Sequence, residues 1–88
     1  EDADIHSNLA AAFVQQGRLD KALEEYQIAV ELNPDLAEAF FGLGVVYIQT
    51  GKAEEAIRAI ERFQELDAGK DPTATELAKQ YLQQLKGQ

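Results

Sequence analysis

Few side chains in this sequence could carry out catalysis. The chain has one histidine, His6, and no cysteine. Ser7 follows His6 directly, and adjacent residues on a helix point about 100° apart, so the two cannot pair as a nucleophile and its base. We therefore interpret His6 as a half-buried packing residue rather than as a base or a ligand.

The acidic residues supply the remaining candidates. Glu24-Glu25 and Glu54-Glu55 are adjacent acids, and neighbouring positions on a helix diverge, so neither pair suits acid–base catalysis. Residues 67–71 read DAGKD, which lacks the acid spacing of a calcium loop and is interpreted as a linker. The sequence thus predicts no catalytic residue, no metal site and no cofactor, and we expect a protein that is not an enzyme.

Composition and charge narrow the range of partners. The chain has 88 residues and a net charge of −8. Residues 1–36 contain eight acids and two bases, a net charge of −6. Because an acidic surface repels phosphate backbones, no nucleic acid partner is expected. No apolar run approaches the ~20 residues of a membrane-spanning helix, so no membrane insertion is expected either.

The start of the sequence is relevant to the cellular location of the protein. The sequence begins at Glu1 and contains no methionine. We therefore expect an excised piece or a processed product from which targeting signals were removed. The sequence leaves the location open, and the cytoplasm is favoured.

A repeat of 34 residues organises the chain. FVQQG at 13–17 returns as YIQTG at 47–51. Shifting the sequence by 34 aligns the first unit with the second, with identities at Ala3/Ala37, Leu9/Leu43, Gln15/Gln49, Gly17/Gly51, Ala22/Ala56, Glu31/Glu65 and Leu32/Leu66. We predict one compact domain made of a first repeat at 3–36, a second at 37–70, and a half repeat at 71–86.

Each full unit is predicted to contain two helices. Gly17 and Gly51 follow the first helix, where a left-handed residue can end it. Asn33-Pro34 ends the second helix of the first unit, because proline lacks an amide donor and restricts the residue before it. Leu85 occupies the place of the glycines in the tail, so the tail helix should continue to about Lys86. These patterns predict an all-α protein of five helices.

The unit resembles the tetratricopeptide repeat (TPR) family. The three units read His6-x2-Leu9-Ala10-x2-Phe13, Ala22-x3-Tyr26 and Pro34; Phe40-x2-Leu43-Gly44-x2-Tyr47, Ala56-x3-Ile60 and Ala68; and Ala74-x2-Leu77-Ala78-x2-Tyr81. The resemblance implies a right-handed superhelical stack of antiparallel helix hairpins, closed by a C-terminal capping helix. It also implies a non-catalytic protein–protein interaction scaffold. Small residues are expected where two helix backbones approach closely, namely at Ala10, Ala22, Gly44 and Ala56.

The resemblance further implies that the first helices of the units line a concave groove, which holds a partner peptide or helix. Carried over by position, the groove residues are Asp4, Ser7, Asn8, Ala11, Gln15, Glu38, Phe41, Val45, Ile48, Gln49, Thr75, Glu76, Lys79, Leu82 and Gln83. The residues expected to contact the partner are Asn8, Ala11, Gln15, Phe41, Val45, Ile48, Gln49 and Lys79.

One apolar stripe has two interpretations. Phe41, Val45 and Ile48 are spaced i, i+4, i+7 on a helix whose other face, with Leu43 and Tyr47, already belongs to the predicted core. A helix that is apolar on two sides is buried on both. Either the tail helix covers this stripe within the monomer, or a partner protein covers it.

A structural role is the alternative function. Two and a half units fall below the minimum of about three that a stable array needs. Ile5 and Ala12 are expected on an open N-terminal end, where a preceding unit would pack. The chain would then be a part of a longer array, or a self-associating module such as a homodimer.

Overall fold

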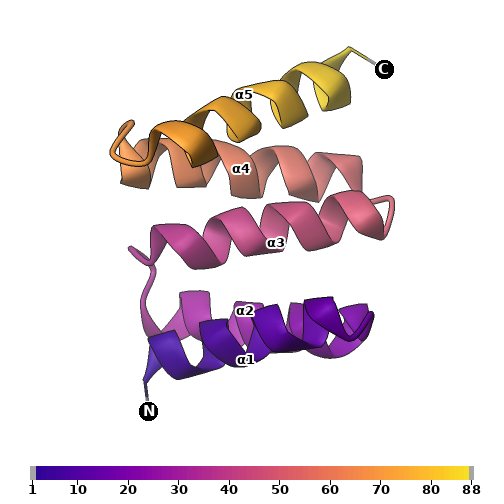
Figure 1. Ribbon diagram of the computed structural model, residues 1–88, viewed down its shortest axis with the longest axis vertical. Coiled ribbons are helices and arrows are strands. Elements are labelled where there is room, and N and C mark those ends of the chain that lie inside the picture. The colour runs from indigo at the N-terminus through magenta and orange to yellow at the C-terminus, as the bar shows by residue number, and fades with distance from the viewer. Residues whose placement is uncertain (1, 88) are drawn as a thin grey trace.

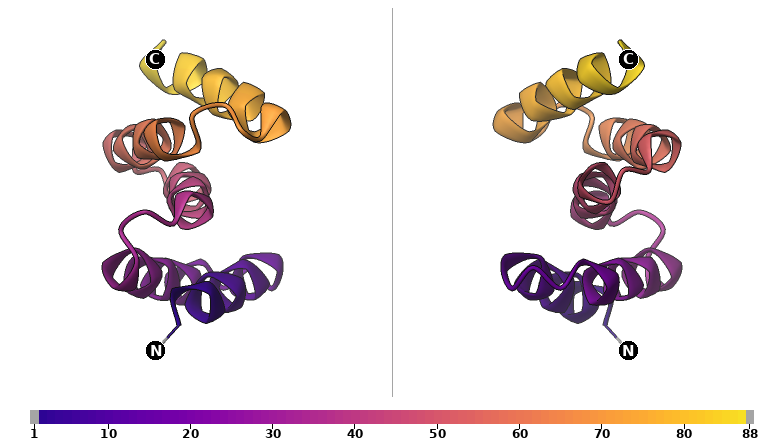
Figure 2. Two further views of the ribbon diagram at one scale, coloured as in Figure 1. Left: turned by 90° about the vertical axis from the view of Figure 1, so that its left-hand side faces the viewer. Right: turned by 90° about the vertical axis from the view of Figure 1, so that its right-hand side faces the viewer.

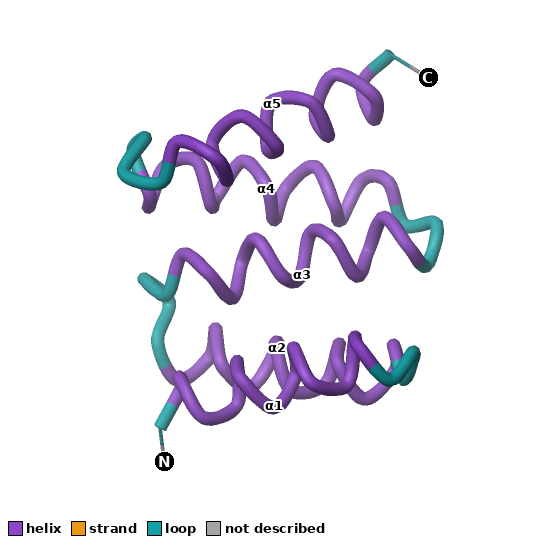
Figure 3. The backbone as a smooth tube through the Cα atoms, in the orientation of Figure 1, coloured by secondary structure: helices purple, strands orange, loops and turns teal. Residues whose placement is uncertain are grey.

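A computed structural model describes residues 2–87 as five α-helices joined by short turns (Figure 1). They are α1 (Ala3–Gln15), α2 (Leu19–Leu32), α3 (Ala37–Gln49), α4 (Ala53–Asp67) and α5 (Pro72–Lys86). No strand occurs among the described residues, as the tube in Figure 3 shows. The predicted all-α fold of five helices is confirmed.

The repeated glycine turn has the same structure in both units. Gly17 and Gly51 have φ angles of 76° and 78°, in the left-handed region that glycine enters without steric cost. The amide of Arg18 donates a hydrogen bond of 2.9 Å to the carbonyl of Phe13, and the equivalent bond 34 residues later is 2.8 Å long. FVQQG and YIQTG are therefore two copies of one helix C-cap.

The tail helix begins and ends where the sequence predicts. The side chain of Asp71 accepts a hydrogen bond of 3.1 Å from the amide of Ala74, and Pro72 occupies the first turn. An aspartate before the helix and a proline in its first turn both suit a helix N-terminus, because the first amides have no partner within the helix. With Leu85 in place of a turn glycine, α5 continues to Lys86.

The helices form a curved stack of antiparallel pairs. α1 pairs with α2, α3 pairs with α4, and α5 packs on α4. α1, α3 and α5 run in the same direction in Figure 1. The side views show an open curve, with α1 and α5 at its two ends and α3 between them (Figure 2). α1 also contacts α3 directly, so these two helices share the inner side of the curve.

The core consists of two clusters. One contains residues of α1 to α4 around Tyr26 and Leu43, and the other joins α4 to α5 through Ile60, Phe63 and Leu82. The small residues lie where backbones meet, since Ala10, Ala22 and Ala56 are completely buried. A Cβ at Gly44 would lie 2.4 Å from Cγ1 of Ile60, so the close approach predicted at that glycine is confirmed.

Candidate functional site

The one histidine links the two helices of the first unit. Nδ1 of His6 lies 2.6 Å from Oε1 of Glu25, and the two side chains are 23% and 20% exposed. His6 is thus half-buried, as predicted, and Glu25 is its partner rather than a freely solvated acid. Ser7 is buried, so its hydroxyl is not available as a nucleophile beside His6 and Glu25.

Metal-binding and membrane-spanning features are absent from the described residues. Among residues 2–87, no group of three or more His, Asp or Glu side chains is arranged to hold a metal ion. No helix in the same range combines the length and the apolar character needed to cross a membrane. The features that remain are surfaces, and the inner side of the curve is the first of them.

The α1 part of the inner side is polar and open. Asn8, Ala11 and Gln15 are all exposed, as a groove residue must be. Ser7, which was carried over into the same set by position, is only 4% exposed and does not line the groove.

The apolar stripe of α3 is only partly covered. The ring of Phe41 lies 5.0 Å from that of Phe63 and 6.2 Å from that of Tyr81, and Ile48 packs against the same α4–α5 cluster. Phe41, Val45 and Ile48 are nevertheless only half-buried. The tail helix therefore covers the α4 side of the stripe and leaves part of it open.

The tail helix presents a different side to the groove than the repeat pattern implies. Leu77 is 37% exposed, whereas its equivalent Leu43 is 5% exposed. α5 instead buries Ala78 and Leu82 against α4, which removes Leu82 from the groove set. Tyr81 reaches Phe41, and Leu77 lies one turn before Tyr81 on the same stripe. Leu77 is therefore a candidate groove residue, although the groove set expected from the repeat pattern does not include it.

Lys79 lies on another side of α5. It lines a shallow pocket of about 380 Å³ together with Gln64 of α4, and with Leu82, Gln83 and Lys86 of its own helix. Residues 79 and 81 point about 200° apart on a helix. The structure therefore does not bring Lys79 together with Phe41 and Val45.

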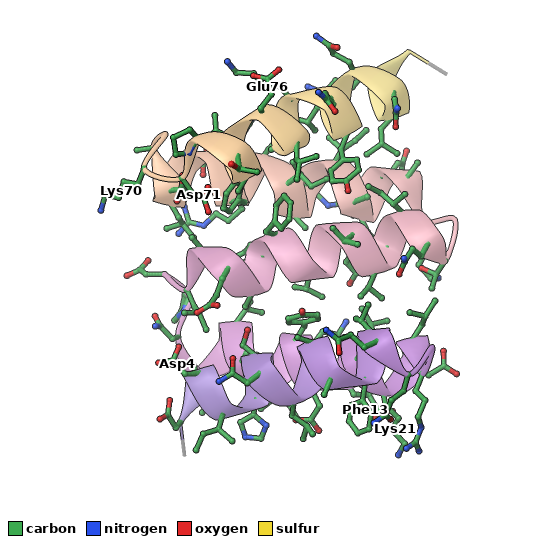
Figure 4. The ribbon with its side chains drawn as sticks, viewed as in Figure 1. Asp4, Phe13, Lys21, Lys70, Asp71 and Glu76 are labelled. Carbon is green, nitrogen blue, oxygen red and sulfur yellow. The ribbon has the colours of Figure 1, made fainter. Side chains whose placement is uncertain are left out.

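Polar residues mark the two ends of the inner side. Asp4 and Glu38 are exposed in the first turns of α1 and α3, and Figure 4 shows Asp4 at the start of α1. Gln15 and Gln49 are exposed at the last residues of the same two helices. Since α1 and α3 run in the same direction, one edge of the surface is acidic and the other carries neutral amides.

Tyr26 of α2 packs against α3, one of the helices of the inner side. It is 7% exposed, and a Cβ at Gly42 of α3 would lie 2.3 Å from its ring. Burial, with a smaller contribution from the Glu38 carboxylate, raises the pKa of the Tyr26 hydroxyl above 10.0. The tyrosine ring takes the place of a side chain on α3 and holds that helix at a fixed distance from α2.

Two family models match the chain. The model described as "TPR repeat" matches residues 11–51, and the model described as "Tetratricopeptide repeat" matches residues 37–70. The two matches overlap and together extend from α1 into the turn after α4. They thus cover both of the glycine turns.

Several known proteins are similar to this chain. The TPR repeat-containing protein YpiA of Bacillus subtilis is 31% identical over 78 residues, which is 89% of this chain and 18% of that protein. The crystal structure of MamA matches 98% of this chain and 46% of its own, at a TM-score of 0.85 and 27% identity. A tetratricopeptide repeat domain protein from Salinibacter ruber matches 98% of both chains at a TM-score of 0.86 and 18% identity.

Proposed function

Because the chain belongs to the tetratricopeptide repeat family, we propose that it binds an extended, partly apolar peptide of a partner protein on the inner side of α1, α3 and α5. Repeats of this family generally mediate protein–protein interaction, and the family is generally a non-catalytic scaffold. Beyond this general role, we specify which surface of the chain binds the partner and which kind of peptide fits that surface.

The observation that carries the proposal is the part of the apolar stripe that α5 leaves uncovered. Val45 and Phe41 are only half-buried in the middle of α3. Leu77 of α5 is exposed one turn before Tyr81, the residue whose ring lies 6.2 Å from that of Phe41. Contiguous apolar surface bordered by polar residues is typical of interaction sites. Burying such a strip under a peptide gives about 25 cal/mol for each Å² of apolar surface removed from water.

The polar residues would position the peptide backbone. The amides of Asn8, Gln15 and Gln49 both donate and accept hydrogen bonds, as a peptide group requires. Asp4 and Glu38 at the opposite edge favour basic side chains, because opposite charges across an interface attract and select the partner. Ala11, which occupies the repeat position equivalent to Val45, would provide a flat contact.

Two residues of the expected contact set have smaller roles in this proposal. Ile48 packs on the α4–α5 cluster, so it supports the floor of the strip and contacts a peptide only at its edge. Lys79 lies beside Gln64 and would contact only a peptide that continues over α5.

Peptide selection with a charged substitution tests the proposal. Peptides are selected from a random display library on the wild-type chain, and their affinities are measured by fluorescence anisotropy. Val45→Glu places a charge in the strip without removing a residue of the buried core, and we expect affinity to fall at least about tenfold, since burying an unpaired charge is costly. The selected peptides should combine apolar and basic residues.

The control makes the same substitution outside the groove. Ile5→Glu changes an apolar residue on another surface of α1, so it should bind the selected peptides as wild type does. Circular dichroism and thermal melting check that both variants are folded. Phe41→Ala is less informative because Phe41 also packs on Phe63. If Val45→Glu binds the peptides normally, the inner side of the curve is the wrong surface.

A further inference from the structure

The tail helix is shifted by one residue against the repeat. α3 begins 34 residues after α1, from Ala3 to Ala37, whereas α5 begins 35 residues after α3, from Ala37 to Pro72. α4 has 15 residues where α2 has 14. One residue turns a helix by about 100°, so a residue of α3 corresponds in space to the residue of α5 that lies 35 positions later.

Burial along α5 agrees with a shift of 35. Ala78 then takes the place of Leu43, and the two are 0% and 5% exposed. Leu77, which a shift of 34 would align with Leu43, is 37% exposed. The inner side of α5 is therefore its Leu77 flank, beside Tyr81, whose ring lies 6.2 Å from that of Phe41.

The shift of 35 places a third glutamine in line with two others. Gln15 and Gln49 are the last residues of α1 and α3, and the residue 35 positions after Gln49 is Gln84. All three are exposed. Because α1, α3 and α5 run in the same direction (Figure 1), we infer that Gln15, Gln49 and Gln84 lie along one edge of the inner side, and we call them the amide row. Gln83, which a shift of 34 would select, instead lines the shallow pocket beside Gln64.

We propose that the inner side binds a partner segment in the polyproline II conformation, with a basic, a proline and an apolar residue repeated in triplets. The proposal rests on peptide binding to the inner side, the proposed function, and specifies the conformation and register of that peptide. The amide row would hold the peptide backbone, and the uncovered apolar strip would hold one face of it.

The spacing of the helices favours this conformation. Helices packed side by side lie about 8–10 Å apart, and α1 contacts α3 directly. A polyproline II segment has three residues per turn at about 3.1 Å each, so it returns the same face after about 9 Å. A β-strand returns the same face after about 6.6 Å. Only the polyproline II segment therefore presents one face to each helix in turn.

Glutamine amides suit the backbone of such a segment. A polyproline II segment makes no internal hydrogen bonds, so its carbonyl oxygens are free to accept them. Each glutamine of the amide row has an NH₂ group that can donate to one carbonyl. Proline lacks an amide hydrogen, and a row that binds through carbonyls loses nothing when proline occupies the segment.

Charge at the opposite edge selects the basic residue of each triplet. Glu38 and Gln49 lie eleven residues apart on α3, about 16 Å along the helix axis. Asp4 has the place of Glu38 on α1. A backbone held at the amide row leaves space toward these acids for a long side chain, and opposite charge favours arginine or lysine there. The apolar residue of the triplet would then lie on Val45.

Synthetic peptides of defined register test the proposal. The probe repeats Arg-Pro-Leu three times, and its matched control has the same nine residues with the three leucines at alternate positions. Affinities for the full chain are measured by fluorescence anisotropy. We expect the triplet peptide to bind at least about tenfold more tightly, because only its side chains are in step with the helices. Glycine in place of each proline keeps the spacing without the preformed conformation, and should weaken binding at least about threefold.

Two neighbouring glutamines give a matched pair of variants. Gln84→Ala should lower affinity for the triplet peptide about fivefold, which corresponds to the loss of one hydrogen bond. Gln83→Ala removes the same atoms one residue earlier, on the flank of α5 that lines the pocket with Gln64, and should bind as wild type does. Both glutamines are exposed, so circular dichroism should show both variants folded.

Two results would overturn the proposal and leave peptide binding intact. In the first, peptides selected from the library bind wild type and lose affinity on Val45→Glu, but the triplet peptide binds no more tightly than the alternating one. In the second, Gln84→Ala keeps full affinity for the triplet peptide, or Gln83→Ala loses as much as Gln84→Ala does. If instead Val45→Glu binds every peptide as wild type does, the inner side is the wrong surface, and the proposed function fails as well.

Discussion

The size of the Tyr26 side chain limits which residue can occupy the facing position on α3. It is nearly buried between α1 and α3, and its ring fills the space that a side chain at Gly42 would need. An aromatic side chain on one helix is therefore accommodated by an absent one on the next.

The hydroxyl of Tyr26 makes stability depend on pH in the alkaline range. Its pKa is raised above 10.0 by burial, with a contribution from Glu38, so folding favours the neutral phenol. This stabilisation is complete below the unfolded pKa of about 10 and is lost as pH rises through the higher folded pKa. We expect the urea midpoint to fall above about pH 10.

Tyr26→Phe separates this group from the others that titrate in the same range. The variant should be as well folded as wild type at neutral pH, and should lose less stability than wild type above about pH 10. The measurement is a set of urea unfolding curves across the alkaline range. An identical loss in wild type and Tyr26→Phe would show that other groups cause it.

Helix ends differ between the turns within a unit and the turn after α4. The two glycine turns use Gly17 and Gly51 in the left-handed region. At the end of α4, Ala68 adopts φ 53° and Gly69 follows at φ 82°. A left-handed conformation crowds the Cβ of an alanine against the backbone, so this turn contains a small steric cost that the others avoid.

Removing that cost should stabilise the chain. Ala68→Gly is expected to raise the free energy of unfolding by about 1 kcal/mol, because glycine has no Cβ to clash. Gln16→Gly is the matched control, since Gln16 is also a helix C-cap residue but has φ −83° and should gain nothing. Both are measured by chemical denaturation. A loss of stability in Ala68→Gly would show that Ala68 makes a favourable contact greater than its strain.

The whole molecule is held together mainly by contacts between successive helices. α1 with α2, α2 with α3, α3 with α4, and α4 with α5 are the principal pairs, with α1 also touching α3. In such an array each part is stabilised by its neighbours, and distant parts can open separately. α5 contacts one side of the stack, so it should be the first helix to open.

Leu82→Ala tests this local opening. Leu82 is 9% exposed and joins α5 to the Ile60 and Phe63 cluster, so its truncation should cost about 2–3 kcal/mol. Native-state hydrogen exchange should show faster exchange of the α5 amides, while those of α2 near Ala29 keep their protection. Equal acceleration throughout the chain would mean that the five helices unfold as one unit.

The sequence by itself determined the helices, because their ends depend on local chemistry. The glycine turns, the Asp71-Pro72 start and the extension of α5 past Leu85 all follow from residues within one or two turns of each site. The exposure of Asn8, Ala11 and Gln15 also followed from their positions in the first helix of a repeat.

Only the tertiary structure decided the rotation of α5 about its own axis, and therefore which part of the apolar α3 stripe stays uncovered. The repeat pattern places Leu77 where Leu43 is buried, yet α5 buries Ala78 and Leu82 instead. α5 packs mainly on α4, so its orientation follows the contacts that it makes with Phe63 and Phe41. Such contacts join residues far apart in the chain, and a periodic pattern along the sequence does not contain them.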